Sequence, residues 1–161
     1  MDLVQPPGHH LAQLNVARAL DDMDSPRLAD FVAALDRVNA VAERSPGFVW
    51  RLKTDGNNAL DVKVADDPRF IVNMSIWETP AHLEHFVWNT IHKRVYAKKS
   101  RWFEARATPH FVMWWVEHNH RPTPEEAMAR LAHLTSHGPT ALAFGWESLP
   151  NIKLWMSQRC A

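Results

Sequence analysis

Histidine and tryptophan are the side chains in this sequence with the greatest capacity for chemistry. The chain has ten His and eight Trp among its 161 residues. An imidazole can bind a metal or move a proton near neutral pH, and an indole can stack on a flat ligand. Any single one of them more often serves as a core or surface residue, so its place in the chain must indicate whether it belongs to a site.

His92 is the strongest candidate for a ligand-binding side chain. A helix that begins after Asn89-Thr90 would return every third or fourth residue to one face. That face would carry His92, Val95, Tyr96, Lys99, Trp102 and Phe103. A neutral imidazole on such an apolar face is suited to hold haem iron from one side. A core histidine that donates a hydrogen bond to a backbone carbonyl is the alternative, and the residues leave both open.

The other histidines give weaker patterns. His82, His85 and His92 would share one face of a continuous helix and could reach a common metal ion. Because that face lies opposite the apolar stripe of the helix, we expect a solvated polar stripe and predict no zinc site. His110 and His118 bracket a predicted strand, and either could act as an acid or base in a pocket.

The composition argues against several classes of function. Lys plus Arg and Asp plus Glu balance at 18 each, so the positive field that draws proteins to nucleic acid is absent. The single Cys160 rules out paired-thiol chemistry. No apolar run approaches the roughly 20 residues of a membrane span, and no basic and apolar leader is present, so we expect a cytoplasmic protein. A Gly-rich phosphate loop and a His-Glu-x-x-His zinc motif are also missing.

Periodicity predicts a single α+β domain over residues 1–161, with a core at about 9–146 and a C-terminal arm at 147–161. A residue suited to capping followed by proline predicts helix starts at Ser25-Pro26, Thr79-Pro80 and Thr123-Pro124. The predicted elements are strand 10–16, helix 26–44, strands 48–52 and 70–77, a helical region from 80 interrupted near 89, strand 110–117 and helix 124–137. This order predicts a ferredoxin-like βαββαβ fold with a four-stranded antiparallel sheet and an extra helix and arm.

The predicted strand over residues 70–77 has two unlike faces. One is apolar, and the other carries Asn73, Ser75 and Trp77. A half-polar face needs a cover or a ligand. We expect two copies of the chain to pair through their sheets, which would close a barrel and hide that face. The expected partners are therefore a second copy and a small-molecule substrate.

Five segments carry a family resemblance. They cover residues 11–16, 92–103, 114–116, 122–127 and 138–144. Together they resemble a bacterial and fungal family of unknown function, which is similar to the dimeric α+β barrel group that includes antibiotic-biosynthesis monooxygenases and haem-handling enzymes. The resemblance extends from His10 to about Trp146. It implies a homodimeric barrel.

A narrower resemblance concerns Trp77-Glu78, a short helix and His92-Lys93-Arg94-Val95. This stretch resembles IsdG-type haem-degrading monooxygenases, which implies that His92 is the axial ligand of haem iron. The same resemblance implies that Asn15 corresponds to the first-strand asparagine of their site, so His92 and Asn15 are the expected catalytic residues. The tryptophan of their pocket falls here on Phe86, with Trp88 nearby. The spacing from Trp77 to His92 is shorter here by about one helical turn.

The leading hypothesis is a small-molecule oxidoreductase or monooxygenase-like enzyme with haem held by His92. The expected pocket lies between the helices and the sheet. Its expected lining is Trp77, Phe86, Trp88, Tyr96, Trp102 and Trp114. Two alternatives stay open: a cofactor-free monooxygenase or isomerase of an aromatic metabolite, in which a histidine moves a proton, and a ligand-binding dimer without enzymatic activity.

Overall fold

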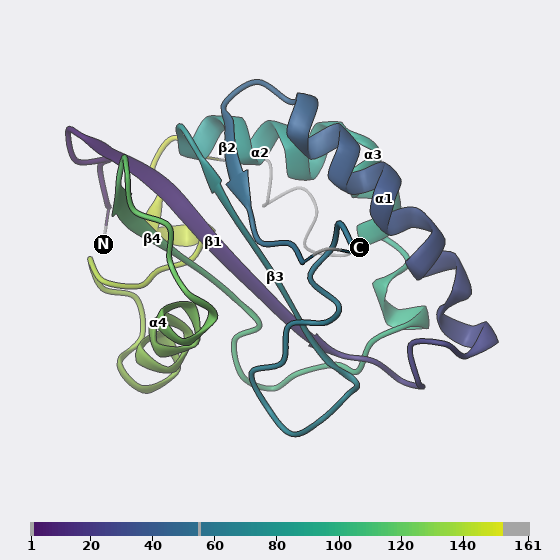
Figure 1. Ribbon diagram of the computed structural model, residues 1–161. Coiled ribbons are helices and arrows are strands. Elements are labelled where there is room, and N and C mark those ends of the chain that lie inside the picture. Colours follow the sequence, from purple (N-terminus) through teal and green to yellow (C-terminus); the bar gives the residue numbers. More distant parts are fainter. Residues whose placement is uncertain (1, 55, 153–161) are drawn as a thin grey trace.

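The fold is centred on one antiparallel sheet of four strands. The computed structural model describes residues 2–54 and 56–152. The strands are β1 (His9–Arg18), β2 (Phe48–Arg51), β3 (Phe70–Trp77) and β4 (Phe111–Glu117), arranged in the order β2-β3-β1-β4. Figure 1 shows the long strand β1 crossing the centre of the molecule. The predicted ferredoxin-like α+β fold is confirmed.

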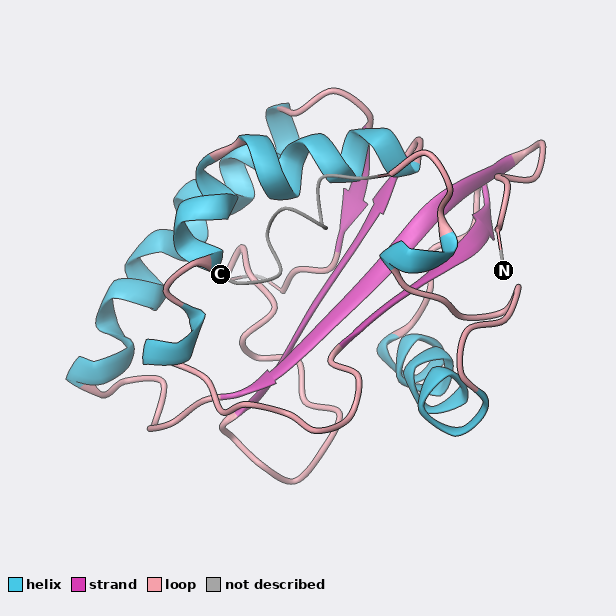
Figure 2. Ribbon diagram, turned by 180° about the vertical axis from the view of Figure 1, so that it is seen from behind, coloured by secondary structure: helices cyan, strands magenta, loops and turns pink. Residues whose placement is uncertain are grey.

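The helices lie in two groups on opposite sides of the sheet (Figure 2). One group contains α1 (Ala29–Arg44), α2 (Pro80–Asn89) and the short α3 (Ile91–Tyr96). The other side has α4 (Pro124–His137). The described residues also form three 3₁₀ turns, η1 (Pro26–Leu28), η2 (Lys99–Arg101) and η3 (Trp146–Ser148). Among the described residues, no helix has both the length and the apolar character that crossing a bilayer requires. The cytoplasmic location stays a prediction.

Two of the three predicted helix caps form. The Thr79 hydroxyl accepts a hydrogen bond from the backbone N–H of His82 at 3.3 Å, and the Thr123 hydroxyl accepts one from Glu126 at 3.1 Å. Ser25 and Pro26 do begin a helical turn as predicted, but the Ser25 side chain makes no capping hydrogen bond. Its hydroxyl is buried with no hydrogen-bond partner among the described residues, because Pro26 opens a 3₁₀ turn and α1 begins only at Ala29.

The more apolar face of the sheet packs against α4. Side chains at alternate positions of three strands, including Leu14, Met74 and Trp114, form one core cluster with this helix. The helix contributes Ala127, Leu131 and Leu134. The sequence predicted α4 as an addition to the fold but did not predict which face it covers.

The half-polar face lies on the side of α1 and α2. Trp77 packs there with Leu83 and Phe86 of α2. Helices of the same chain therefore cover Ser75 and Trp77, whereas Asn73 stays exposed, so the expectation that a second copy hides this face is wrong for the first two residues and stays a prediction for Asn73. Dimerisation itself stays a prediction.

Residues after α4 protect the edge strand β4. The backbone N–H of Met113 donates to the carbonyl of Phe144 at 2.8 Å, and the N–H of Phe144 donates back at 2.9 Å. This short pairing covers part of an edge that would otherwise present free backbone groups. Farther on, Leu149 and Ile152 are buried in the core beside α2. The rest of the predicted arm, 153–161, lies outside the described residues.

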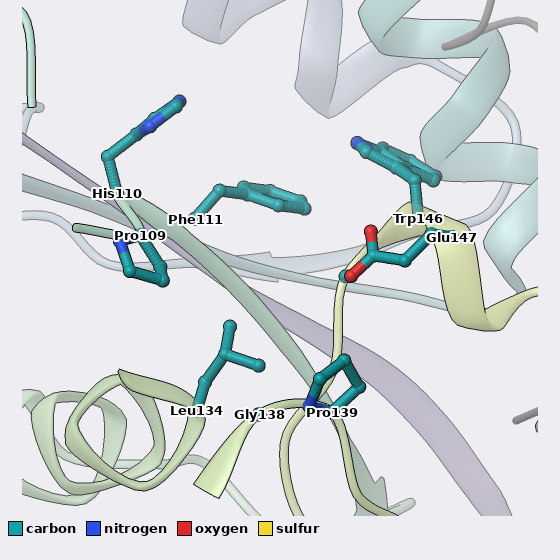
Figure 3. A pocket seen from close by; sticks show the side chains of 9 residues that line it. Pro109, His110, Phe111, Leu134, Gly138, Pro139, Trp146 and Glu147 are labelled. Carbon is teal, nitrogen blue, oxygen red and sulfur yellow. The ribbon is translucent and has the colours of Figure 1, made fainter. Parts of the chain in front are cut away.

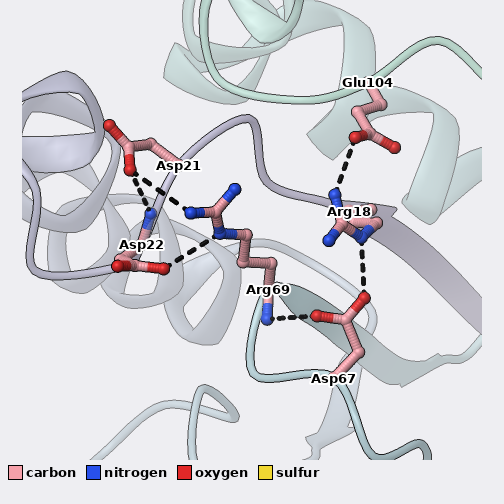
Figure 4. Close-up of polar contacts among 6 residues, drawn as sticks. All are labelled: Arg18, Asp21, Asp22, Asp67, Arg69 and Glu104. Carbon is pink, nitrogen blue, oxygen red and sulfur yellow. Dashed lines mark hydrogen bonds and ion pairs between the residues drawn. The ribbon is translucent and has the colours of Figure 1, made fainter.

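An ion network joins the end of β1 to two loops (Figure 4). The guanidinium of Arg18 bonds to Asp67 and to Glu104, at 2.7 Å in each case. Arg69 pairs with Asp22 at 2.9 Å and with Asp21 at 3.6 Å. The hydrogen bond from Arg18 lowers the pKa of the Asp67 carboxyl, and the backbone N–H of Arg69 acts in the same direction. The network is therefore held at neutral pH and weakens as acid protonates Asp67.

We predict that Leu131→Ala lowers the free energy of unfolding by about 2–4 kcal/mol, because it leaves a cavity between α4 and the sheet. The matched control is Leu142→Ala. Leu131 is 4% exposed and Leu142 is 56% exposed, so the control should cost less than about 0.5 kcal/mol. Urea unfolding of both variants measures the difference. Equal effects would contradict the packing of α4 as an integral layer.

Candidate functional site

The candidate site is built around the break between α2 and α3. Helix α2 ends at Asn89 because Thr90 adopts an extended backbone, with φ −125° and ψ −173°. The Thr90 hydroxyl donates to the carbonyl of Phe86 at 2.5 Å and accepts from the backbone N–H of His92 at 3.3 Å. One threonine therefore ends the first helix and caps the next. The predicted interruption near residue 89 is confirmed.

The break frees a backbone carbonyl that orients His92. In an unbroken helix the Val87 carbonyl would accept from the N–H four residues later. Here His92 Nδ1 lies 3.2 Å from that carbonyl oxygen. Because a carbonyl can only accept, Nδ1 must carry the proton, and Nε2 keeps its lone pair. Within the part of the chain that the structure describes, Nε2 has no hydrogen-bond partner.

His92 is neutral at physiological pH. Burial of the ring lowers its pKa from 6.5 to about 4, and the hydrogen bond to Val87 opposes this with a smaller effect. The side chain is half-buried overall. The imidazole can therefore offer a lone pair without first losing a proton.

Aromatic rings connect His92 to the sheet. Trp77 stacks on Phe86 at 5.1 Å between ring centroids, and Phe86 lies 5.1 Å from the His92 ring. His92 stacks on Tyr96 at 6.1 Å, and Trp88 meets Tyr96 edge-on at 5.5 Å. The structure thus brings together five of the residues that the sequence placed in one pocket.

Polar side chains on the sheet continue from this aromatic group. Trp77 Nε1 donates to the Ser75 hydroxyl at 2.9 Å. The amide of Gln13 donates to the same hydroxyl at 2.7 Å and to Asn73 Oδ1 at 2.9 Å. Asn73 is exposed although it lies in the middle of an inner strand. The helix layer therefore leaves this part of the sheet open to solvent.

Asn15 lies beside this opening. It is paired in register with Asn73 across β1 and β3, and it is half-buried. Directly opposite residues of antiparallel strands share a face, so both amides belong to the helix-side face of the sheet. The catalytic role assigned to Asn15 stays a prediction.

Sequence reasoning missed two polar residues of this face. Gln13 alternates with Leu11 and Asn15 and could have been found by its period of two. Arg51 is buried opposite Ser75, where its Nε donates to Glu43 of α1 at 2.7 Å. An irregularity of register within β2 precedes Arg51, so simple alternation could not assign its face.

Two tryptophans of the predicted pocket lie elsewhere. Trp102 packs in a separate cluster with Leu28 and Phe31. Helix α3 ends at Tyr96 and a 3₁₀ turn follows, so the helical spacing that linked Trp102 to His92 does not continue. Trp114 lies on the opposite face of the sheet, against α4. The structure does not group these two residues with His92.

The remaining histidines are dispersed. His82 hydrogen-bonds the Thr79 hydroxyl at 2.8 Å, and His118 stacks on His10 at 4.0 Å between ring centroids. His110 lines an open groove at the start of β4 that contains none of the residues of the predicted haem pocket (Figure 3). Over residues 2–54 and 56–152, no group of three or more His, Cys, Asp or Glu is placed to hold a metal ion.

Comparison with known proteins gives a family and several distant structural likenesses, among them two proteins from Nitrosomonas europaea. The model of a domain of unknown function, DUF3291, matches residues 10–159. A protein of unknown function from Nitrosomonas europaea, NE2512, is 14% identical with a TM-score of 0.45, and covers 74% of this chain and 98% of its own. A "putative antibiotic biosynthesis monooxygenase" from the same organism is 16% identical with a TM-score of 0.46. The match covers 73% of this chain and 97% of that protein. No curated protein matches.

We predict that the stability of the protein depends on pH through His92. Between pH 6.5 and about 4 the unfolded chain binds a proton that the folded chain does not, so the folded state loses stability as the pH falls through this range. With allowance for the partial exposure of the ring, the loss should reach about 1–3 kcal/mol. Gln does not titrate, so a His92→Gln variant does not lose stability in this way. Its free energy of unfolding should therefore rise relative to that of wild type as the pH falls.

Urea unfolding near pH 7 and near pH 5 tests this expectation. His85→Gln, an exposed position on α2, shows the effect of losing an imidazole at the surface. If the free energies of unfolding of wild type and His92→Gln differ by the same amount at both pH values, the ring is not buried in the folded protein.

Proposed function

The chain belongs to the DUF3291 family, and we propose that it is a small-molecule oxidoreductase of the monooxygenase-like kind. The recognition of a family of unknown function from the sequence is confirmed. We place the site between the sheet and the helices α2 and α3. It consists of His92, the aromatic rings beside it and the open polar part of the sheet.

The observation that carries this proposal is the state of His92. Its Nδ1–H donates to the Val87 carbonyl, and its Nε2 has a free lone pair. Metal-binding histidines usually donate their second ring N–H to a carbonyl or carboxylate, which fixes the tautomer and the ring direction. Because a core histidine can make the same hydrogen bond to a carbonyl, the proposal rests on the Nε2 lone pair, which has no hydrogen-bond partner in the described chain.

Haem is the cofactor that we favour. His92 would hold its iron through Nε2, and the half-buried ring of Tyr96 beside it would offer an apolar contact to a planar macrocycle. Trp77, Phe86 and Trp88 are buried and would support these two rings from the core. Bound haem would supply one-electron and oxygen chemistry that no side chain of this group can perform. The donor atom fits the group, because a neutral imidazole with a free Nε2 lone pair is a common axial ligand of haem iron.

The protein's own residues would bind and orient the substrate. The exposed amide of Asn73 and the neighbouring Asn15 can hydrogen-bond a carbonyl or hydroxyl of a small molecule. Gln13, whose amide also donates to the Ser75 hydroxyl, donates to Asn73 Oδ1 and so fixes the Asn73 side chain. The stacked rings of Trp77 and Phe86 exclude water on the adjoining side. The Asn73 amide would therefore provide orientation, and the half-buried rings of His92 and Tyr96 would provide contact area.

A cofactor-free monooxygenase or isomerase is the second candidate. The open polar part of the sheet favours it, since amides can bind an aromatic metabolite without a metal ion. A general base works best with a pKa near the working pH, however, and the pKa of His92 is lowered to about 4. The lowered pKa makes His92 a poor base at neutral pH, so we rank this candidate second.

We predict that the purified protein binds added haemin and gives a Soret band shifted from that of free haemin. His92→Ala should weaken this binding by about tenfold or more, since even the loss of an outer-shell partner of a metal ligand costs that much. Visible spectra recorded during haemin titration measure the effect. His85→Ala is the matched control on α2 and should bind as wild type does.

Two results would contradict haem binding by His92. One is a wild-type protein that causes no change in the haemin spectrum, which would favour the cofactor-free candidate. The other is a His92→Ala variant with the same spectrum and affinity as wild type, which would place any bound haem elsewhere.

A further inference from the structure

A groove outside the candidate site lies beyond the edge of β4 and has a volume of about 340 Å³ (Figure 3). Phe111 and Trp146 form one side of it, with their ring planes inclined by 12° and their centroids 5.6 Å apart. Leu134 of α4 and Pro139 lie on the other side. These side chains make the groove mainly apolar.

One carboxylate, that of the exposed residue Glu147, points into this mainly apolar groove. Figure 3 shows the Glu147 side chain pointing between the two sides. Within the described residues its carboxylate has neither a salt bridge nor a hydrogen bond. Gly145 provides the space, because a Cβ there would lie 2.7 Å from Oε2 and 2.9 Å from Oε1 of Glu147. The missing side chain of Gly145 therefore allows this position of the carboxylate.

A backbone acceptor lies at the same edge. Met113 makes both of its backbone hydrogen bonds to Phe144, on the side away from β1. Residues two apart in a strand direct their backbone groups to the same side, so the carbonyl of Phe111 also points away from β1. In the described chain it has no backbone partner. The groove thus combines two hydrogen-bond acceptors with an aromatic side.

The groove contains no fixed positive charge to neutralise Glu147. Neither Lys nor Arg is among the described residues that line it. His110 does line it, but burial and then the nearby charges of Lys99 and Arg106 lower the pKa of its imidazole, so it is neutral at pH 7. A cation would therefore find an unpaired negative charge there.

We propose that this groove binds a small organic ammonium ion, of the class of primary amines that carry an apolar or aromatic group. Glu147 pairs with the ammonium, and the Phe111 carbonyl accepts one of its N–H groups. The rings of Phe111 and Trp146, with Leu134 and Pro139, contact the apolar part. Neutral ligands of the same shape lack the charge that Glu147 complements.

The test compares benzylammonium with benzyl alcohol, which has nearly the same shape and no charge. Isothermal titration calorimetry of the wild-type protein at neutral pH should show saturable binding of benzylammonium. Benzyl alcohol should bind about tenfold more weakly or not at all. Equal binding of the two probes, or no saturable binding of benzylammonium, would overturn the proposal.

Two variants assign the binding to this groove. Glu147→Gln should weaken benzylammonium binding by about tenfold or more and leave that of benzyl alcohol unchanged. Gly145→Ala should have the same selective effect, because the added methyl displaces the carboxylate. Glu117→Gln makes the same chemical change at an exposed position at the other end of β4 and should have no effect. Unchanged binding by a folded Glu147→Gln variant would overturn the assignment.

Discussion

The candidate site depends on one hydrogen bond, from His92 Nδ1 to the Val87 carbonyl. A buried carbonyl left without a donor costs about 1–3 kcal/mol, so the break at Thr90 would be unfavourable if nothing replaced the lost helical bond. His92 supplies that donor. In return, its tautomer and its ring direction are fixed. The same local event therefore satisfies the backbone and prepares a side chain for ligand binding.

One face of the sheet forms most of the apolar core, and the other face carries the candidate binding site. Helix α4 packs on the apolar face, where side chains such as Met74 and Trp114 are fully buried. The other face can then contain Gln13 and Ser75, which are buried but hydrogen-bonded to one another. A polar group in a core is tolerated when it has a partner. This arrangement leaves Asn73 free to face solvent.

Local signals predicted local structure, and they failed where tertiary contacts decide. Thr79-Pro80, Thr123-Pro124 and the Asn89-Thr90 break were readable because caps act within a few residues. Strand alternation identified two faces of β3 but could not indicate which helices would cover each face. Trp102 was placed wrongly because a 3₁₀ turn replaced the expected helix, and the exposure of Asn73 depends on packing that no sequence pattern encodes.

The most direct test of this account is the tautomer of His92 at neutral pH. Long-range ¹H–¹⁵N correlation spectra of the histidine rings distinguish a protonated from an unprotonated nitrogen, and the His92→Gln variant assigns the signals. We predict a neutral ring with the proton on Nδ1 and a free lone pair on Nε2. A neutral ring with its proton on Nε2 would contradict the hydrogen bond to Val87, and a charged imidazolium would contradict the free lone pair on Nε2; either result would contradict the proposed ligand role.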